Sequence, residues 1–197
     1  MKYFLIIVIG LIISGCSTKS TDESEIRKTI ENYLECTKKE DFECLYSLTH
    51  PRSFESFTKQ QVITDVQQGM HNENYDIIVK SSFLDSISTV IPFNENKYAM
   101  VKTKSNIIWV SKQASNPNET LVQMCSVFSD MYGKQNIKCN TVKNQIDIRS
   151  NETSYLIYEA KDKKWYVLSG SIEKNVVRLI PRTIKQNLQK LHKPSIE

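Results

Sequence analysis

The chain has 197 residues, of which 40% are hydrophobic and 24% are charged, and its formal net charge at pH 7 is +4. This length and composition fit one globular domain with its own apolar core. So small a net charge gives no reason to expect a nucleic-acid-binding protein. Beyond residue 13, no apolar run is long enough to span a bilayer as a helix.

The N-terminal segment predicts an export signal. Lys2 precedes an apolar stretch over residues 3–13, which small residues follow at once. A membrane-spanning helix needs about 20 apolar residues, so this stretch is too short to be one. A basic start, an apolar middle and a small-residue end are typical of a secretory signal.

Ile13-Ser14-Gly15-Cys16 closely resembles the bacterial lipobox. The resemblance implies that residues 1–15 are a signal peptide removed after export, and that Cys16 is acylated on its thiol and its new amine. Ser17 is not Asp, which by resemblance to the enterobacterial sorting rule favours the outer membrane, facing the periplasm. In an organism with one membrane, the same signal places the domain on its outer face. The alternative is an ordinary secretory signal followed by a chance cysteine.

The first part of the mature chain predicts a tether and then helices. Residues 16–23 form a lipidated, mostly small and polar tether, and residues 24–197 form a single domain. Apolar residues at helical spacing predict a helix over residues 24–38 and a short second helix capped by Asp41, ended by His50-Pro51. Thr58 and Gln61 have the spacing of a capping box and start a third helix.

Apolar residues then alternate with a period of two. The alternation predicts long strands over residues 75–93 and 98–110, joined as a hairpin by a turn at residues 94–97. Residues 121–132 favour a helix stopped by Gly133, with a strand as the competing interpretation. The end of the chain predicts four short strands and a final helix over 177–191, with Pro181 in its first turn. The short strands are near residues 136–140, 144–149, 154–160 and 164–169.

Helices followed by a mostly antiparallel sheet predict the α+β class. The order resembles the nuclear transport factor 2-like superfamily, also called SnoaL-like or cystatin-like. Residues 26–48 (IRKTIENYLECTKKEDFECLYSL) are similar to its opening helices, and residues 155–168 (YLIYEAKDKKWYVL) to its closing hairpin. The resemblance implies N-terminal helices on a curved, cone-like sheet that encloses a pocket. The predicted helix at 121–132 and the extra C-terminal helix depart from that pattern.

Four cysteines remain besides Cys16. An even number in an exported domain indicates two disulfides, for which three pairings exist. We favour the pairing local in sequence, Cys36 with Cys44 and Cys125 with Cys139; buried free thiols are the alternative.

Motifs for common chemistry are missing from the sequence. The predicted mature chain has only three glycines, contains no GxSxG, and pairs none of its histidines as HxxxH. We therefore expect no bound nucleotide, no other cofactor and no histidine metal site.

Asp85 is the strongest candidate for catalysis. It shares the parity of Ile77, Phe83 and Ile87, the expected buried face, where desolvation raises the pKa of a carboxyl group towards that of a general base. His71, near the expected mouth of the cone, is a candidate partner for Asp85. The alternative for Asp85 is that a strand bulge or a solvated sheet end turns its side chain away from the buried face. The alternative for His71 is that it is an exposed polar residue of a loop.

Charge is distributed unevenly along the chain. Residues 21–45 hold eight acidic and four basic residues, whereas residues 161–197 hold nine basic and three acidic residues. A basic C-terminal helix suits anionic lipid or an acidic envelope partner, although a solvated helix face has the same composition.

Three functions remain open. The first is a non-catalytic envelope lipoprotein, held at the membrane by its lipid, that binds an envelope protein or a small ligand. The second is a cone-fold enzyme of the isomerase or cyclase type that uses Asp85. The third is an immunity or inhibitor protein that captures a toxin.

Overall fold

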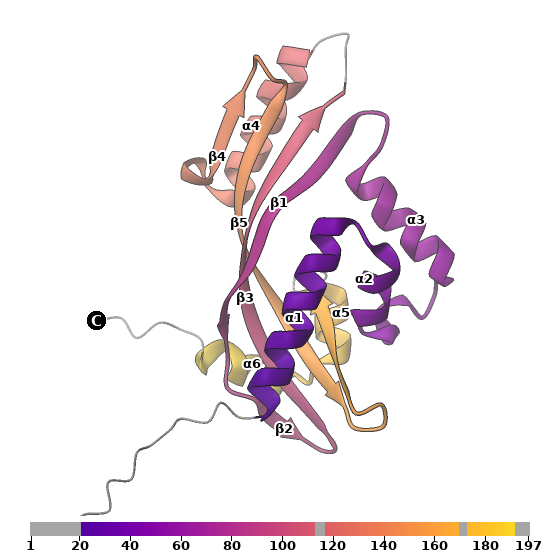
Figure 1. Cartoon of the computed structure of the whole chain (residues 1–197). Coiled ribbons are helices and arrows are strands. Elements are labelled where there is room, and N and C mark those ends of the chain that lie inside the picture. The colour runs from indigo at the N-terminus through magenta and orange to yellow at the C-terminus, as the bar shows by residue number, and fades with distance from the viewer. Residues whose placement is uncertain (1–20, 113–116, 170–172, 192–197) are drawn as a thin grey trace, which may run out of the picture.

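The computed structural model describes residues 21–112, 117–169 and 173–191. The predicted signal peptide over residues 1–15, Cys16 and His192 lie outside these residues. No helix within the described ranges is both long enough and apolar enough to cross a membrane. The fold is α+β, as predicted: N-terminal helices contact a six-stranded antiparallel sheet, and further helices lie at the C-terminal end (Figure 1).

The N-terminal helices begin and end close to where the sequence predicts. They are α1 (Thr21–Lys39), α2 (Phe42–Leu48), the 3-10 helix η1 (Pro51–Phe54) and α3 (Lys59–Met70). Asp41 caps α2 by accepting a hydrogen bond from the Cys44 N–H (3.0 Å), and the predicted capping box of Thr58 and Gln61 is present at α3. Helix α1 starts three residues earlier than expected, because Asp22 stabilises its first turn and binds Lys97.

Two long strands form the centre of the sheet. β3 (Asn96–Ser111) and β5 (Gln145–Glu159) pair over 14 consecutive residues without a register shift. β1 (Tyr75–Ile87) and β2 (Ile91–Phe93) follow one another along the free side of β3. β4 (Ile137–Asn140) and β6 (Lys164–Ser169) do the same along β5.

Two predicted strand boundaries are wrong. The expected single strand over residues 75–93 is β1 and β2, separated at Ser88, whose hydroxyl accepts a hydrogen bond from the Met100 N–H (2.8 Å). The expected separate strands 144–149 and 154–160 are the single strand β5, because the polar residues between them remain paired with β3.

The remaining helices are α4 (Pro117–Tyr132), the 3-10 helix η2 (Lys134–Asn136), α5 (Glu173–Leu179) and α6 (Arg182–Leu191). The helical interpretation of residues 121–132 is confirmed, and Gly133, at φ 87°, follows α4 directly. The expected single helix over 177–191 is wrong. Pro181 separates two helices, because proline lacks an N–H and its ring clashes with the preceding helical turn.

Three apolar clusters hold the helices on the sheet. Ile26 and Ile30 of α1 pack on Val101 and Leu156, whereas Leu188 of α6 belongs to a second cluster on the opposite face. A third cluster packs α4 on the other end of the sheet, around Trp109, Leu121, Ile146 and Ile148.

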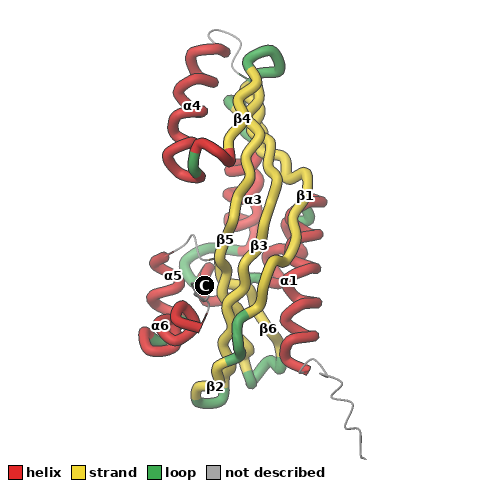
Figure 2. Tube along the Cα trace, turned by 90° about the vertical axis from the view of Figure 1, so that its left-hand side faces the viewer, coloured by secondary structure: helices red, strands yellow, loops and turns green. Residues whose placement is uncertain are grey.

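The strands twist strongly between the two ends of the sheet. Val101 faces α1, yet Trp109, of the same parity on β3, faces α4. Figures 1 and 2 show the consequence: α1 lies on one side of the sheet, and α4, α5 and α6 lie on the other. At the α4 end, no described helix covers the side of the sheet that faces the viewer in Figure 1.

Candidate binding site

Asp85 does not lie where the strand pattern predicts. β1 contains two register shifts relative to β3, between Val79 and Ser81 and between Leu84 and Ser86. Each bulge reverses the alternation of faces, so Leu84 packs in the cluster beneath α1. The Asp85 side chain is 33% exposed and accepts a hydrogen bond from Lys104 Nζ (2.6 Å). The burial that would have made Asp85 a general base is therefore missing.

His71 does not partner Asp85. It caps the end of α3, and its Nδ1 lies 2.8 Å from Asp76 Oδ1 and its Nε2 3.0 Å from Glu40 Oε2. Lys112 Nζ lies 2.5 Å from the same Asp76 oxygen. Asp85 is nine residues further along β1, or about 30 Å away at the rise of a strand.

The contacts of His71 and Asp76 shift the pKa values of both side chains. The hydrogen bond to Asp76 is the main reason that the pKa of His71 is raised, with Glu40 adding to it. The pKa of Asp76 is lowered, first by Lys112 and then by His71. The network joins the turn after α1, the end of α3 and the start of β1, so its evident role is to hold the helices on the sheet.

Both predicted disulfides are present. Cys36–Cys44 joins α1 to α2, and Cys125–Cys139 joins α4 to β4. Cys36, Asp41 and Cys44 place possible metal-ligating atoms within 4.8 Å of one another. Both of those sulfurs are in the disulfide, so the group offers no thiolate to a metal.

A buried contact between His50 and Glu159 was not predicted from the sequence. His50 Nε2 lies 2.9 Å from Glu159 Oε1, and the Arg52 N–H donates to His50 Nδ1 (3.3 Å). Because Nδ1 accepts that hydrogen bond, the proton of neutral His50 is on Nε2 and faces Glu159. His50 and Glu159 are 109 residues apart, and no local pattern links them. Since His50 is buried, the pair fastens η1 to the sheet and offers little to a substrate.

A small apolar pocket lies between the N-terminal helices and β6; we call it the helix pocket. Its volume is about 130 Å³, and Tyr33, Phe42 and Val62 are among the residues that line it. Burial is the main reason that the pKa of Tyr33 is raised. Ser53 Oγ, which also belongs to a lining residue, is buried without a hydrogen-bond partner among the described residues. The pocket holds only a few non-hydrogen atoms.

A larger hollow, of about 520 Å³, lies on the uncovered side of the sheet at the α4 end. We call this surface the open sheet face. It is formed by Ile78, Lys80, Asn106, Ile108, Val110, Lys138, Asp147 and Arg149.

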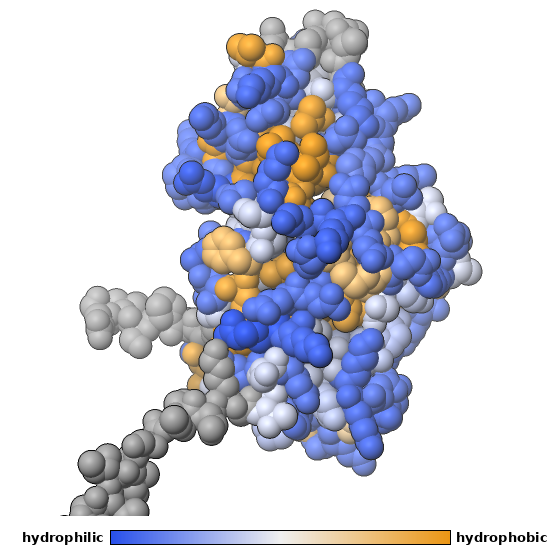
Figure 3. Space-filling model, in the orientation of Figure 1, coloured by the Kyte–Doolittle hydropathy of each residue, from blue (hydrophilic) through white to orange (hydrophobic). Residues whose placement is uncertain are grey.

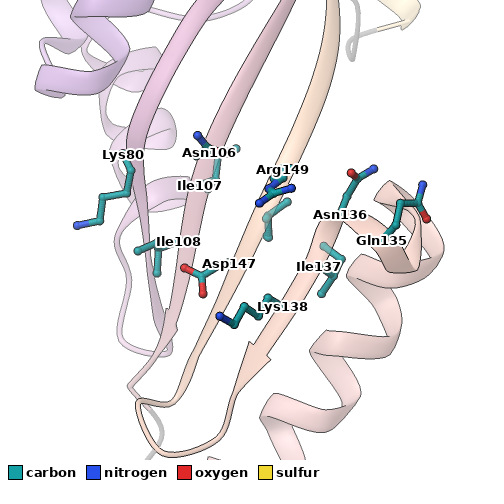
Figure 4. Close-up of a pocket in the computed structure, with 11 residues that line it drawn as sticks. Lys80, Asn106, Ile107, Ile108, Gln135, Asn136, Ile137, Lys138, Asp147 and Arg149 are labelled. Carbon is teal, nitrogen blue, oxygen red and sulfur yellow. The ribbon is translucent and has the colours of Figure 1, made fainter.

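The strand register explains why these side chains share one face. Ile78, Ile108, Asp147 and Lys138 lie opposite one another on β1, β3, β5 and β4. Arg149 lies opposite Asn106 in the next row. Figure 4 shows Lys80, Asn106, Ile108, Asp147, Arg149 and Lys138 spread across the four strands.

The open sheet face is apolar on β1 and β3, where Ile78, Ile108 and Val110 lie, and charged on β5 and β4, with Lys80 a further charge on β1. In the view of Figure 3, hydrophobic surface appears in the upper part of the molecule, surrounded by hydrophilic side chains. Lys80, Lys138 and Arg149 form no ion pair with any described residue, and the nearby Asp147 accepts a hydrogen bond from Gln145. A partner with apolar groups and an acidic rim would complement it.

The open sheet face was not predicted, although the sequence contains one signal for it. Two adjacent apolar residues, as in Ile77-Ile78 and Ile107-Ile108, break a strict alternation and indicate a strand with apolar groups on both faces.

The comparisons with known proteins add no relative from which a role can be transferred: no protein-family model matches the chain, and no curated protein is significantly similar to it.

Proposed function

We propose that the chain is a lipoprotein of the bacterial cell envelope, anchored through Cys16, whose domain binds a protein partner without catalysis. The match of residues 13–16 to the lipobox supports the anchor. The two disulfides support export, because such bonds persist in oxidising compartments. Ser17 favours the outer membrane, facing the periplasm.

The N-terminal helices packed on an antiparallel sheet support the resemblance to the nuclear transport factor 2-like superfamily. The helix pocket lies between those helices and the sheet, which corresponds to the inside of the cone in that superfamily. The α4–β4 unit and the pair α5–α6 are additions to that pattern.

The open sheet face is the observation that carries the binding function. Helices cover both sides of the sheet at the α1 end and one side at the α4 end, which leaves Ile78 and Ile108 facing outwards among charges. Such a surface suits a protein partner better than the helix pocket suits a ligand, because it is several times larger and open. The enzyme hypothesis has lost its main support, since Asp85 is not in a desolvated site.

Mass spectrometry of the N-terminal peptide tests the anchor. We expect a peptide that begins at Cys16 and carries acyl chains, and no such peptide from the Cys16→Ser variant. An unmodified thiol at Cys16, or a retained Met1, would refute the lipoprotein assignment.

Crosslinking in intact envelopes followed by affinity capture tests the binding function. We expect one stoichiometric partner with the native chain and its loss in the Lys80→Glu/Arg149→Glu variant, because the reversed charges repel an acidic rim. Lys28→Glu/Lys161→Glu is the matched control, because both residues are exposed and remote from this face. Equal capture by all three chains would refute the role of the open sheet face. Recovery of a toxin would identify an immunity protein.

A further inference from the structure

Helix α6 presents a cationic surface to solvent. It contains Arg182, Lys185 and Lys190 and no acidic residue. None of the three forms an ion pair with a described residue. Ile184 and Leu188 turn the opposite side of the helix into the core. The positive charge is therefore held in place by the packing of the helix, and no described acid neutralises it.

A hollow of about 430 Å³ lies beside these charges. Val177 and Ile180 of the α5 side and Arg182, Lys185 and Gln186 of α6 line it. Val177 is 64% exposed and Leu191 at the end of α6 is 58% exposed. Cations next to exposed apolar side chains match the boundary between lipid headgroups and acyl chains.

Helix α6 and the start of α1, which Cys16 precedes by five residues, lie at the same end of the sheet. Asp22, in the first turn of α1, accepts a hydrogen bond from Lys97 Nζ (2.7 Å). The next residue on β3, Tyr98, belongs to the same cluster as Leu188 of α6. Figure 2 shows α1 and α6 on opposite sides of the sheet, near β2. Cys16 lies five residues before Thr21, so it reaches at most about 18 Å from the start of α1.

We infer that α6 is a second membrane contact, at which Arg182, Lys185 and Lys190 bind the anionic headgroups of the bilayer that holds the lipid anchor. The inference rests on the proposed anchor and adds an orientation to it. The α6 side faces the bilayer, and the first turn of α1, which begins five residues after Cys16, lies at the same end of the sheet. The open sheet face, at the other end of the long strands, then points away from the membrane.

Sedimentation with lipid vesicles tests the contact without the anchor. The chain over residues 16–197 with Cys16→Ser keeps every residue of the three clusters, which extend from Ile26 to Leu188. Vesicles are made of phosphatidylcholine alone or with about 30% phosphatidylglycerol, in about 0.1 M salt. We expect binding to the anionic vesicles only, weakened by added salt.

A variant with Arg182→Gln, Lys185→Gln and Lys190→Gln should bind the anionic vesicles about a hundredfold more weakly, because each basic residue at such a surface contributes about fivefold. The control variant, with Lys38→Gln, Lys134→Gln and Lys143→Gln, loses the same net charge at exposed positions outside α6 and should bind as the unmutated chain does. Circular dichroism checks that both variants are folded.

Three results would overturn the inference: equal binding to both kinds of vesicle, equal loss in the two variants, or binding to an acidic polypeptide but not to the vesicles. The test is independent of the anchor, because Cys16 is replaced in every chain. An unmodified Cys16 in the native protein would refute the lipoprotein assignment and leave the vesicle result unchanged.

Discussion

The Cys125–Cys139 disulfide offers a quantitative test of how the α4 end is held together. The bond closes a loop with a sequence separation of 14, compared with 8 for Cys36–Cys44. In the chain-entropy description, loops of these lengths stabilise the fold by about 3 kcal/mol and about 2.6 kcal/mol. We expect the Cys125→Ala/Cys139→Ala variant to lose about 3 kcal/mol in free energy of unfolding and about 6–12 °C in Tm.

Urea unfolding of the oxidised proteins measures the loss in free energy of unfolding for each disulfide variant. Hydrogen exchange shows where in the fold the loss occurs. Protection should fall most in α4, where Leu121 and the ring contact between Trp109 and Phe128 (6.1 Å) remain to hold the helix. Cys36→Ala/Cys44→Ala is the matched control, with normal exchange in α4. A loss below about 1 kcal/mol for Cys125–Cys139, or increased exchange spread evenly over the sheet, would refute the reasoning.

Three further predictions follow from the packing and the titrating groups. Leu156→Ala should cost about 2–5 kcal/mol in urea unfolding because Leu156 is fully buried beneath α1, whereas Val122→Ala on the exposed side of α4 should cost less than about 0.5 kcal/mol; similar costs would contradict the assigned core. Because the pKa of His71 is raised on folding, protonated His71 stabilises the fold below pH 6.5, its ordinary pKa, and this contribution is lost as pH rises through the pKa of the folded state. Because the pKa of Asp76 is lowered on folding, ionised Asp76 stabilises the fold above pH 3.8, and this contribution is lost as pH falls through the pKa of the folded state. Unfolding free energies should therefore decline from pH 6 to 8 in the native chain and less so in His71→Gln; identical profiles would exclude this contribution. Asp85→Asn should change stability by less than about 1 kcal/mol, since it removes one partly exposed ion pair, and a larger loss in thermal unfolding would show a role that the structure does not reveal.

Local chemistry in the sequence predicts local structure well. The capping box at Thr58, the cap at Asp41 and the helix stop at Gly133 each depend on a few adjacent residues, and all three are present. The disulfides were predictable for the same reason, because each joins neighbouring elements.

The errors arise where distant strands decide the outcome. The bulges of β1 exist only in relation to β3, and one of them moves Asp85 to the solvent side. Likewise, residues 150–153 are polar and end a strand in any local pattern, yet β3 keeps them paired. His71 meets Glu40 through the packing of α3 against the turn after α1, so no sequence period connects them.

The sheet twists strongly between its α1 end and its α4 end. The central strands β3 and β5 are the principal link between these two ends along the long axis of the molecule. β3 and β5 are paired over 14 residues without interruption, and each end of this ladder carries its own apolar cluster. A pulling force between the ends acts parallel to the strands, so the covalent backbones of both β3 and β5 carry it, while the hydrogen bonds between them lie across the direction of pull. A protein held at one end and loaded at the other would therefore resist tension along its strongest direction.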